Sequence, residues 1–265
     1  MFYFSLQVKQ SQQFLKNYIC FFKNKLMKGY PLLTVVLLHS ALALGQPVFK
    51  NPGISNSESF EIKDFIDNTN GYTSTKINIS LKERNNQKYY YVRVDEGDFF
   101  LNEIEVNYND LTTISEKRKD KKTQSLIECY ENNGNGVIHF FNKDEKIDKI
   151  FHNDEKNIYS RYAYFISFRG FPFEVGKSVT FDTYMFEYGN ALSMKVKALS
   201  KERITVKAGS FVCYKLELSV AGWISLIAPY KSYLYFKADG THQFVKYEER
   251  SDNGGWNTDE LVKEN

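Results

Sequence analysis

The segment of residues 202–220, ERITVKAGSFVCYKLELSV, constrains the fold more than any other part of the sequence, because it contains two alternating runs around a short turn. Side chains of a β-strand point to opposite faces in turn, so a period of two indicates a strand with one buried face. Gly209 supplies the backbone freedom that a short hairpin loop needs. We therefore predict a β-hairpin that turns at residues 207–210. The face expected in the core carries Val212, Tyr214, Leu216, Leu218 and Val220, and the opposite face carries Cys213, Lys215, Glu217 and Ser219.

Turn-forming residues recur about every 12 positions in the first half of the chain, a rhythm typical of antiparallel strands. These turns are at residues 70–71, 85–86, 96–98, 109–110, 119–120, 133–136 and 143–144. The segments between turns alternate in polarity or are rich in aromatic and β-branched residues, which favour strands. The expected strands include residues 77–81, 89–94, 99–108, 126–130, 137–141, 179–188, 192–198, 233–236, 244–247 and 256–262. The pattern predicts an all-β, mainly antiparallel fold.

Residues 157–168 interrupt the strand pattern and favour a helix. Ile158, Tyr162, Phe165 and Ile166 would share one helical face, and residues 169–170, Arg-Gly, can end the helix. We expect one short helix that covers an open edge or the mouth of the sheet.

The N-terminal part of the chain predicts export. Residues 27–45 combine a basic start, an apolar run of about a dozen residues and small residues at Ala43 and Gly45, as in a cleaved secretory signal. The expected cut precedes Gln46; a cut after Ala43 and an uncleaved membrane anchor are the alternatives, although the apolar run is shorter than the roughly 20 residues of a span. Residues 1–26 are then a leader extension or a mis-assigned start. Residues 46–265 form a single β-rich domain.

The net charge argues against binding to nucleic acid. Residues 1–45 hold five lysines and no acidic residue, so their removal changes the formal net charge from +3 to −2. A nucleic-acid binder needs a concentrated basic surface. The only dense basic run, residues 117–122, lies between two expected strands, and we interpret it as a solvated turn.

Catalytic and metal-binding patterns are not recognisable in the sequence. His139, His152 and His242 stand alone, and the common hydrolase, metalloprotease and nucleotide-binding motifs are missing. We therefore expect no cofactor and no enzymatic activity, with an enzyme of unrecognised type as the least favoured alternative. In an oxidising compartment a disulfide between Cys129 and Cys213 is allowed; two buried thiols are the alternative.

Aromatic residues are abundant, with 22 Phe and 19 Tyr. They can fill the core of a sheet, line a curved sheet that holds an apolar ligand, or face lipid in an outer-membrane barrel. Residues 221–229 are apolar and uncharged although they connect two strands, so they form either a buried plug or a flap that touches a ligand, a membrane or a partner. The candidate binding residues are Trp223, Ile224, Leu226, Ile227, Tyr162 and Phe165.

Residues 159–262 resemble a family of exported Gram-negative proteins known as domain of unknown function 3108, and residues 58–154 resemble it more weakly. The motifs that carry the resemblance are residues 169–173 with Gly176, 202–206, 208–211 leading into 213–217, 233–236 and 245–247. Lys207 stands where the family usually has proline. The resemblance implies a periplasmic protein without an established activity, and association with the outer membrane is compatible with it.

By loose analogy, the architecture is similar to the curved sheets, or half-barrels, of periplasmic lipoprotein carriers. The first functional hypothesis is therefore the binding of a lipid-like apolar ligand or an envelope partner. The alternatives are a structural envelope protein and an outer-membrane barrel.

Overall fold

A computed structural model of the chain describes residues 48–65, 72–132, 136–142, 145–150, 158–185, 190–222, 225, 230–250 and 254–264. The fold consists of strands and one short helical segment. The strands are β1 (Ser57–Phe65), β2 (Tyr72–Arg84), β3 (Gln87–Glu96), β4 (Phe100–Asn107), β5 (Thr113–Asp120), β6 (Leu126–Asn132), β7 (Gly136–Asn142), β8 (Glu145–Ile150), β9 (Ser178–Met185), β10 (Asn190–Val206), β11 (Gly209–Val220), β12 (Lys231–Lys237), β13 (Phe244–Arg250) and β14 (Trp256–Glu264).

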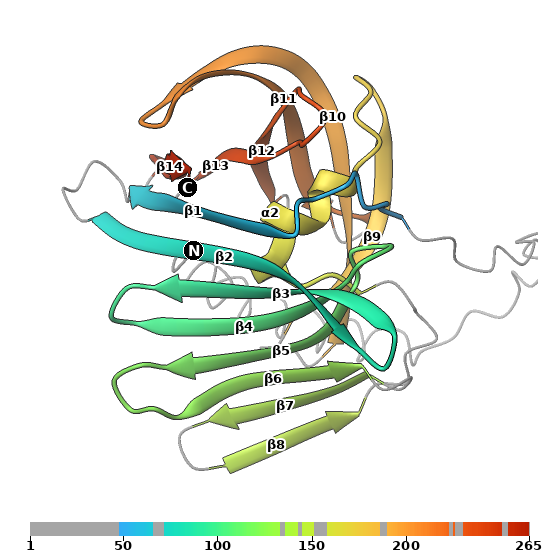
Figure 1. The fold of residues 1–265 in the computed structure, drawn as a ribbon, viewed down its shortest axis with the longest axis vertical. Helices are drawn as coiled ribbons and strands as arrows, with labels where there is room; N and C mark the ends of the chain where they lie inside the picture. The colour runs from blue at the N-terminus through green and yellow to red at the C-terminus, as the bar shows by residue number, and fades with distance from the viewer. Residues whose placement is uncertain are drawn as a thin grey trace, which may run out of the picture.

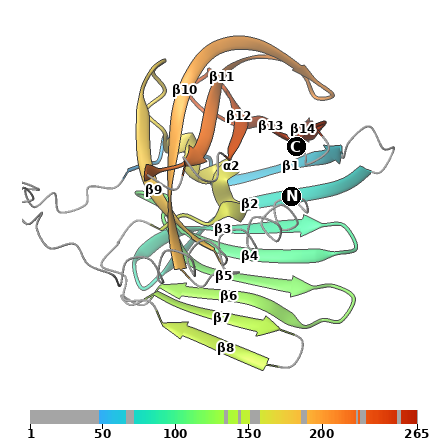
Figure 2. The same cartoon turned by 180° about the vertical axis from the view of Figure 1, so that it is seen from behind.

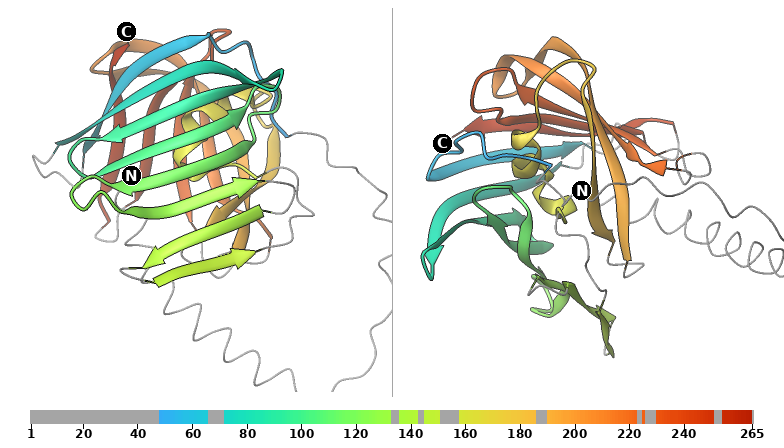
Figure 3. Two further views of the ribbon diagram at one scale, coloured as in Figure 1. Left: turned by 60° about the horizontal axis from the view of Figure 1, so that its bottom comes forward. Right: turned by 90° about the vertical axis from the view of Figure 1, so that its right-hand side faces the viewer.

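All these strands belong to one antiparallel sheet of 14 strands, in the order β8-β7-β6-β5-β4-β3-β2-β1-β14-β13-β12-β11-β10-β9. In the strand order of the described residues, two meanders, β1–β8 and β9–β14, are therefore adjacent where β1 pairs with β14. The order is linear, with β8 and β9 as its edges, so the described sheet is open. The sheet curves strongly, so that its two arms, the meanders β1–β8 and β9–β14, face each other (Figures 1 and 3). The predicted all-β curved sheet with one short helix is confirmed.

The strand faces follow the alternation of the sequence. Ile77 and Ile79 of β2, Val92 and Val94 of β3, and Ile104 of β4 are all almost completely buried. They point to the concave side of the sheet and form one core with the helical segment. The side-chain period of two predicts the inner residues of these strands correctly, because each strand has one face on the core and one face on solvent.

The helical segment is shorter than predicted, and of its two expected places, an edge or the mouth of the sheet, it does not take the edge. Residues 161–170 form two 3₁₀ turns, Arg161–Ala163 and Phe168–Gly170, on either side of the short helix α2 (Tyr164–Ser167). The segment lies between the two arms of the sheet and does not cover an edge (Figures 2 and 3).

The expected first turn of that helix is instead extended, since its backbone bonds to both arms. The backbone N–H of Thr113 on β5 donates to the carbonyl of Ile158, and the N–H of Tyr159 donates to the carbonyl of Asp182 on β9, both at 2.9 Å. Ser160 then caps the first helical turn by accepting from the N–H of Tyr162 at 3.0 Å. Residues 158–160 thus tie β5 to β9 across the open side of the sheet.

The end of the helical segment is fastened by Arg169 and Gly170. Arg169 forms a two-pronged ion pair with Glu58, at 2.6 and 3.1 Å, and its Nε donates to the carbonyl of Thr241 at 2.9 Å. A Cβ at Gly170 would lie 2.6 Å from the carbonyl oxygen of Lys50, so only glycine allows the N-terminal segment to approach this closely. The helical segment is therefore joined to β1, to the loop before β13 and to the start of the described chain.

The hairpin of β10 and β11 forms as predicted, with Val206 opposite Gly209. Leu216, Leu218 and Val220 are buried as expected. Near the turn the assignment of faces is wrong: Val212 is 42% exposed, while Cys213 on the opposite face is fully buried. At this end the other face is covered, because Cys213 lies opposite Lys237 of β12, whose ammonium group sits over the ring of Phe211.

The two cysteines of the described chain are not joined to each other. Cys129 on β6 and Cys213 on β11 are both buried, and no disulfide links them. Their strands belong to different arms of the sheet. Of the two possibilities allowed by the sequence, the structure therefore has the pair of buried thiols.

Candidate functional site

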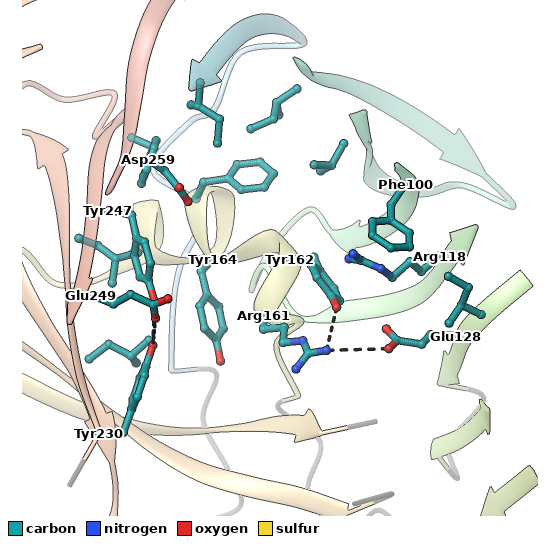
Figure 4. Close-up of a pocket in the computed structure, with 18 residues that line it drawn as sticks. Phe100, Arg118, Glu128, Arg161, Tyr162, Tyr164, Tyr230, Tyr247, Glu249 and Asp259 are labelled. Carbon is teal, nitrogen blue, oxygen red and sulfur yellow. Dashed lines mark hydrogen bonds and ion pairs between the residues drawn. The ribbon is translucent and has the colours of Figure 1, made fainter. Parts of the chain in front are cut away.

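A cavity of about 230 Å³ lies between the concave face of the sheet and the helical segment (Figure 4). Most of its wall is aliphatic or aromatic. The apolar residues of the wall are Ile62, Ile77, Val94, Phe100, Ile127, Phe165, Leu218, Leu234 and Phe244. They come from both arms of the sheet and from α2, so the cavity exists only because the sheet curves around the helical segment.

The first polar group of the cavity, here named the arginine group, consists of Arg118, Glu128, Arg161 and Tyr162. Arg161 donates to the hydroxyl of Tyr162 at 2.7 Å and lies 3.9 Å from a carboxylate oxygen of Glu128. The guanidinium of Arg118 lies 4.4 Å from the centre of the Tyr162 ring. Figure 4 shows these side chains together on one side of the cavity.

Arg118 corrects the interpretation of the basic run. Residues 117–120 belong to strand β5 (Thr113–Asp120) and not to a solvated turn. Lys117 is exposed, whereas Arg118 points inward with only 7% of its surface exposed. It remains charged there because Glu96 lies 3.2 Å away and Asn102 accepts a further hydrogen bond. The alternation of burial within a charged run could not be recognised from charge alone.

The second polar group, here named the carboxylate group, consists of Asp64, Glu249 and Asp259 with Tyr230 and Tyr247. All except Asp64 line the cavity. The hydroxyls of Tyr247 and Tyr230 donate to Glu249 at 2.7 and 3.2 Å. Asp64 of β1 lies directly opposite Asp259 of β14 in the strand register. Figure 4 shows Glu249, Tyr230 and Tyr247 across the cavity from the arginine group, with Tyr164 between the two groups.

Two carboxyl groups of this cluster have perturbed pKa values. Burial, together with the neighbouring carboxyl of Asp259, raises the pKa of Asp64 to about 8. Burial also raises the pKa of Glu249, although the hydrogen bond from Tyr247 opposes this effect. Near neutral pH Asp64 therefore retains a proton that a carboxyl group normally releases.

This retention of protons predicts a pH dependence of stability. An aspartate in the unfolded chain titrates near 3.8, and Asp64 in the folded chain near 8, so folding takes up a proton between these values and stability falls as pH rises through this window. The variant Asp64→Asn should lose less unfolding free energy between about pH 5 and pH 8 than the unsubstituted protein. One pKa unit corresponds to about 1.4 kcal/mol, so the expected difference exceeds about 1 kcal/mol. Urea unfolding at the two pH values measures it.

The control for this prediction is Asp98→Asn, on an exposed position of the turn before β4. Its stability should follow that of the unsubstituted protein at both pH values. Equal pH dependence in all three proteins would show that Asp64 is not held in its protonated form.

The structure brings together only part of the candidate binding residues. Tyr162 and Phe165 line the cavity. Trp223, Ile224, Leu226 and Ile227 lie outside the described residues, so the choice between plug and flap for residues 221–229 stays a prediction.

The carboxyl groups of Asp64, Glu249 and Asp259 were not among the residues predicted from the sequence. Two of them were visible as acidic residues at buried positions of an alternating strand. Asp64 continues the series Phe60 and Ile62, and Asp259 precedes Leu261 in the same series. This signal places a residue on the inner face, but it does not show that distant strands will bring the carboxyl groups together.

Within the described ranges, no group of three or more His, Cys, Asp or Glu residues has the arrangement of a metal site. In the same ranges no helix has the length and hydropathy needed to cross a membrane.

Comparison with known proteins identifies one family. The family model named "Protein of unknown function (DUF3108)" matches residues 69–259. No curated protein shows a significant match. The matched region begins just before β2 and ends within β14, so it includes most of the curved sheet.

Solved structures resemble the chain at low sequence identity. A beta-barrel-like protein of domain of unknown function DUF1849 from Brucella abortus is 8% identical, with 79% of this chain and 96% of that chain covered and a TM-score of 0.40. A protein with a YmcC-like fold from Bacteroides fragilis is 11% identical, with coverages of 82% and 99% and a TM-score of 0.32. The hypothetical lipoprotein YmcC from Escherichia coli is 8% identical, with coverages of 80% and 88% and a TM-score of 0.29.

Proposed function

Since the chain belongs to DUF3108, a family of proteins of unknown function, we propose a function from its own geometry: it is an exported, non-enzymatic protein of the cell envelope that holds a small lipid-like ligand in the concave cavity. The cavity is the observation that carries this proposal. A cavity of roughly 150 Å³ in another protein stays dry and accepts benzene, and the cavity here, about 230 Å³, is larger and mainly apolar. Its polar groups are few and stand at defined places, as in sites that orient a ligand.

The proposed location in the envelope rests on residues 27–45. Their basic start, apolar run and small residues are those of a cleaved signal, which would deliver residues 46–265 to the periplasm. An apolar cavity suits this compartment, since a lipid that crosses an aqueous space has to be shielded from water.

Native mass spectrometry of the protein, purified from the envelope of cells that express the full chain, tests the proposal. We expect a polypeptide that begins at or within a few residues of Gln46 and carries an added mass in the range of a small lipid. The variant Ile127→Phe should reduce ligand occupancy several-fold, because the larger side chain takes up space in a cavity that Ile127 lines while it is itself only half-buried.

The matched control is Val212→Phe, which adds a ring at a position 42% exposed on the β10–β11 hairpin. Its occupancy should equal that of the unsubstituted protein, and thermal melts should show that both variants are folded. A protein that carries no added mass and takes up no octanol when this is supplied contradicts ligand binding. A fixed cross-linked partner under the same conditions would favour the structural envelope protein.

A further inference from the structure

The carboxylate group is part of a larger polar surface on the concave side of the sheet. Two neighbouring cross-strand rows make up this surface. They are Ser232–Glu249–Asn257, across β12, β13 and β14, and Leu234–Tyr247–Asp259–Asp64, which continues to β1. Residues that face each other in an antiparallel pair point to the same side of the sheet. The side chains of Glu249, Asn257, Asp259 and Asp64 therefore converge at one end of the cavity.

The side chain of Asn257 indicates that hydrogen-bonding groups are missing from this surface. Its side chain is only 7% exposed, and neither its amide nitrogen nor its carbonyl oxygen has a hydrogen-bond partner. Oδ1 of Asp64 likewise has none. Buried polar groups without partners are costly and rare in native proteins. By the strand register both side chains lie on the same face of the sheet as Glu249 and Asp259, which line the cavity. An occupant at this end could therefore donate to Oδ1 of Asp64 and to the carbonyl oxygen of Asn257.

The charge of the two polar groups indicates which occupant fits. In the arginine group each cation has an acidic neighbour, since Arg118 pairs with Glu96 and Arg161 lies near Glu128. In the carboxylate group, no ion pair joins Asp64 or Glu249 to a lysine or arginine of the described chain. An anionic head group would thus meet cations already neutralised, whereas a cationic one would meet Asp64 and Glu249, which no lysine or arginine of the described residues neutralises.

We propose that the ligand of the cavity is an amphiphile with an amine head group, and that Asp64, Glu249 and Asp259 hold its ammonium end. This inference rests on the proposed function. An ammonium group has three donors and no acceptor, which suits two or three carboxylate oxygens and the carbonyl oxygen of Asn257. The apolar side chains of Leu218, Leu234 and Phe244 take the hydrocarbon part.

Binding of an amine should release protons. Burial raises the pKa values of Asp64 and Glu249, so these carboxyl groups hold protons more firmly than exposed carboxyl groups do. A nearby positive charge favours their ionised form, so the ammonium group takes the place of a proton. A neutral or anionic head group has no such effect.

The experiment compares octylamine, octanol and octanoate as probes at pH 7, by isothermal titration calorimetry on the purified protein. We expect octylamine to bind at least tenfold more tightly than octanol, and octanoate to bind most weakly. Titrations in buffers of different ionisation enthalpy should show proton release with octylamine alone. The double variant Glu249→Gln/Asp259→Asn should reduce the preference for octylamine over octanol to about twofold or less.

The control is the double variant Glu248→Gln/Glu260→Gln, which removes the same charge from the opposite face of the same two strands, where both residues pair with Lys246. It should keep the full preference for octylamine. If none of the three probes binds, the proposed function itself is wrong. If octanol or octanoate binds as tightly as octylamine, or if the preference survives in Glu249→Gln/Asp259→Asn, the amine proposal is overturned while ligand binding stands.

Discussion

Replacement of Arg169 by methionine is expected to lower the free energy of unfolding by about 3–5 kcal/mol. The side chain of Arg169 is 1% exposed, and its ion pair with Glu58 uses two parallel hydrogen bonds. Removal of the guanidinium would take the Arg169 donors away from Oε2 of Glu58 and from the carbonyl of Thr241 in a partly buried place, and Ser55 would then donate only to Oε1 of Glu58. Burial alone would raise the pKa of Glu58, but the hydrogen bonds and charge of Arg169 outweigh it and hold the pKa below 4.5.

The lowered pKa of Glu58 provides a second test of its ion pair with Arg169. A carboxyl group with a lowered pKa in the folded state stabilises the fold at pH values above its unfolded-state pKa. This contribution is lost as the pH falls from the unfolded-state pKa through the folded-state pKa. The difference between Arg169→Met and the unsubstituted protein, measured by urea unfolding, should therefore shrink in acid below about pH 4.

Arg84 offers a matched control, because it also forms a two-pronged pair, with Glu105, at 3.2 and 2.8 Å. Its side chain is 57% exposed, and exposed pairs contribute little since water and salt screen them. Arg84→Met should leave the unfolding free energy nearly unchanged. Similar losses in the two variants would mean that burial does not decide the strength of the Arg169 pair.

Replacement of Leu216 by alanine should cost about 2–5 kcal/mol, through lost burial of apolar surface and the cavity left behind. Leu216 is fully buried in the core, between Ala198 of β10 and Leu234 of β12 in the strand register. Leu234 also lines the ligand cavity. The loss of the Leu216 side chain should therefore weaken the packing of Leu234 in the cavity wall. Denaturant unfolding measures the cost.

Lys215→Ala, one position away on the other face, is the control. Lys215 is half-buried, and its ammonium group lies 4.6 Å from the ring centre of Tyr233. Loss of this contact should cost about 1 kcal/mol or less. If both variants unfold at the same denaturant concentration, the assignment of faces at Lys215 and Leu216 of β11 is wrong.

Much of the fold could be predicted because it depends on short-range patterns. The β10–β11 hairpin, the pairing of β6 with β7 and the inner positions of β2 and β3 all follow from alternation and from turn residues within a few positions. Strands β1, β5 and β8 were not recognised. The first two carry charged residues at inner positions, Asp64 in β1 and Arg118 in β5, and these obscure the apolar alternation.

The helical segment shows where a local pattern fails. Ile158 and Tyr162 do have helical spacing, and both are buried as a helix face would be. The backbone around Ile158 is nevertheless extended, because it gains hydrogen bonds to β5 and β9 that an isolated helix turn cannot provide. Tertiary hydrogen bonds therefore override the local preference of these residues.

The amino-acid sequence by itself determined the strands, their turns and most of their inner faces, because a side-chain period of two and the conformations of turn residues depend on near neighbours. Only the tertiary structure decided the rest. The ion pair of Arg169 joins residues 111 positions apart, and the carboxylate group unites β1 with β13 and β14. The cavity depends on how strongly the sheet bends around α2. Such contacts depend on the sum of many pairings across the sheet, which no single stretch of sequence encodes.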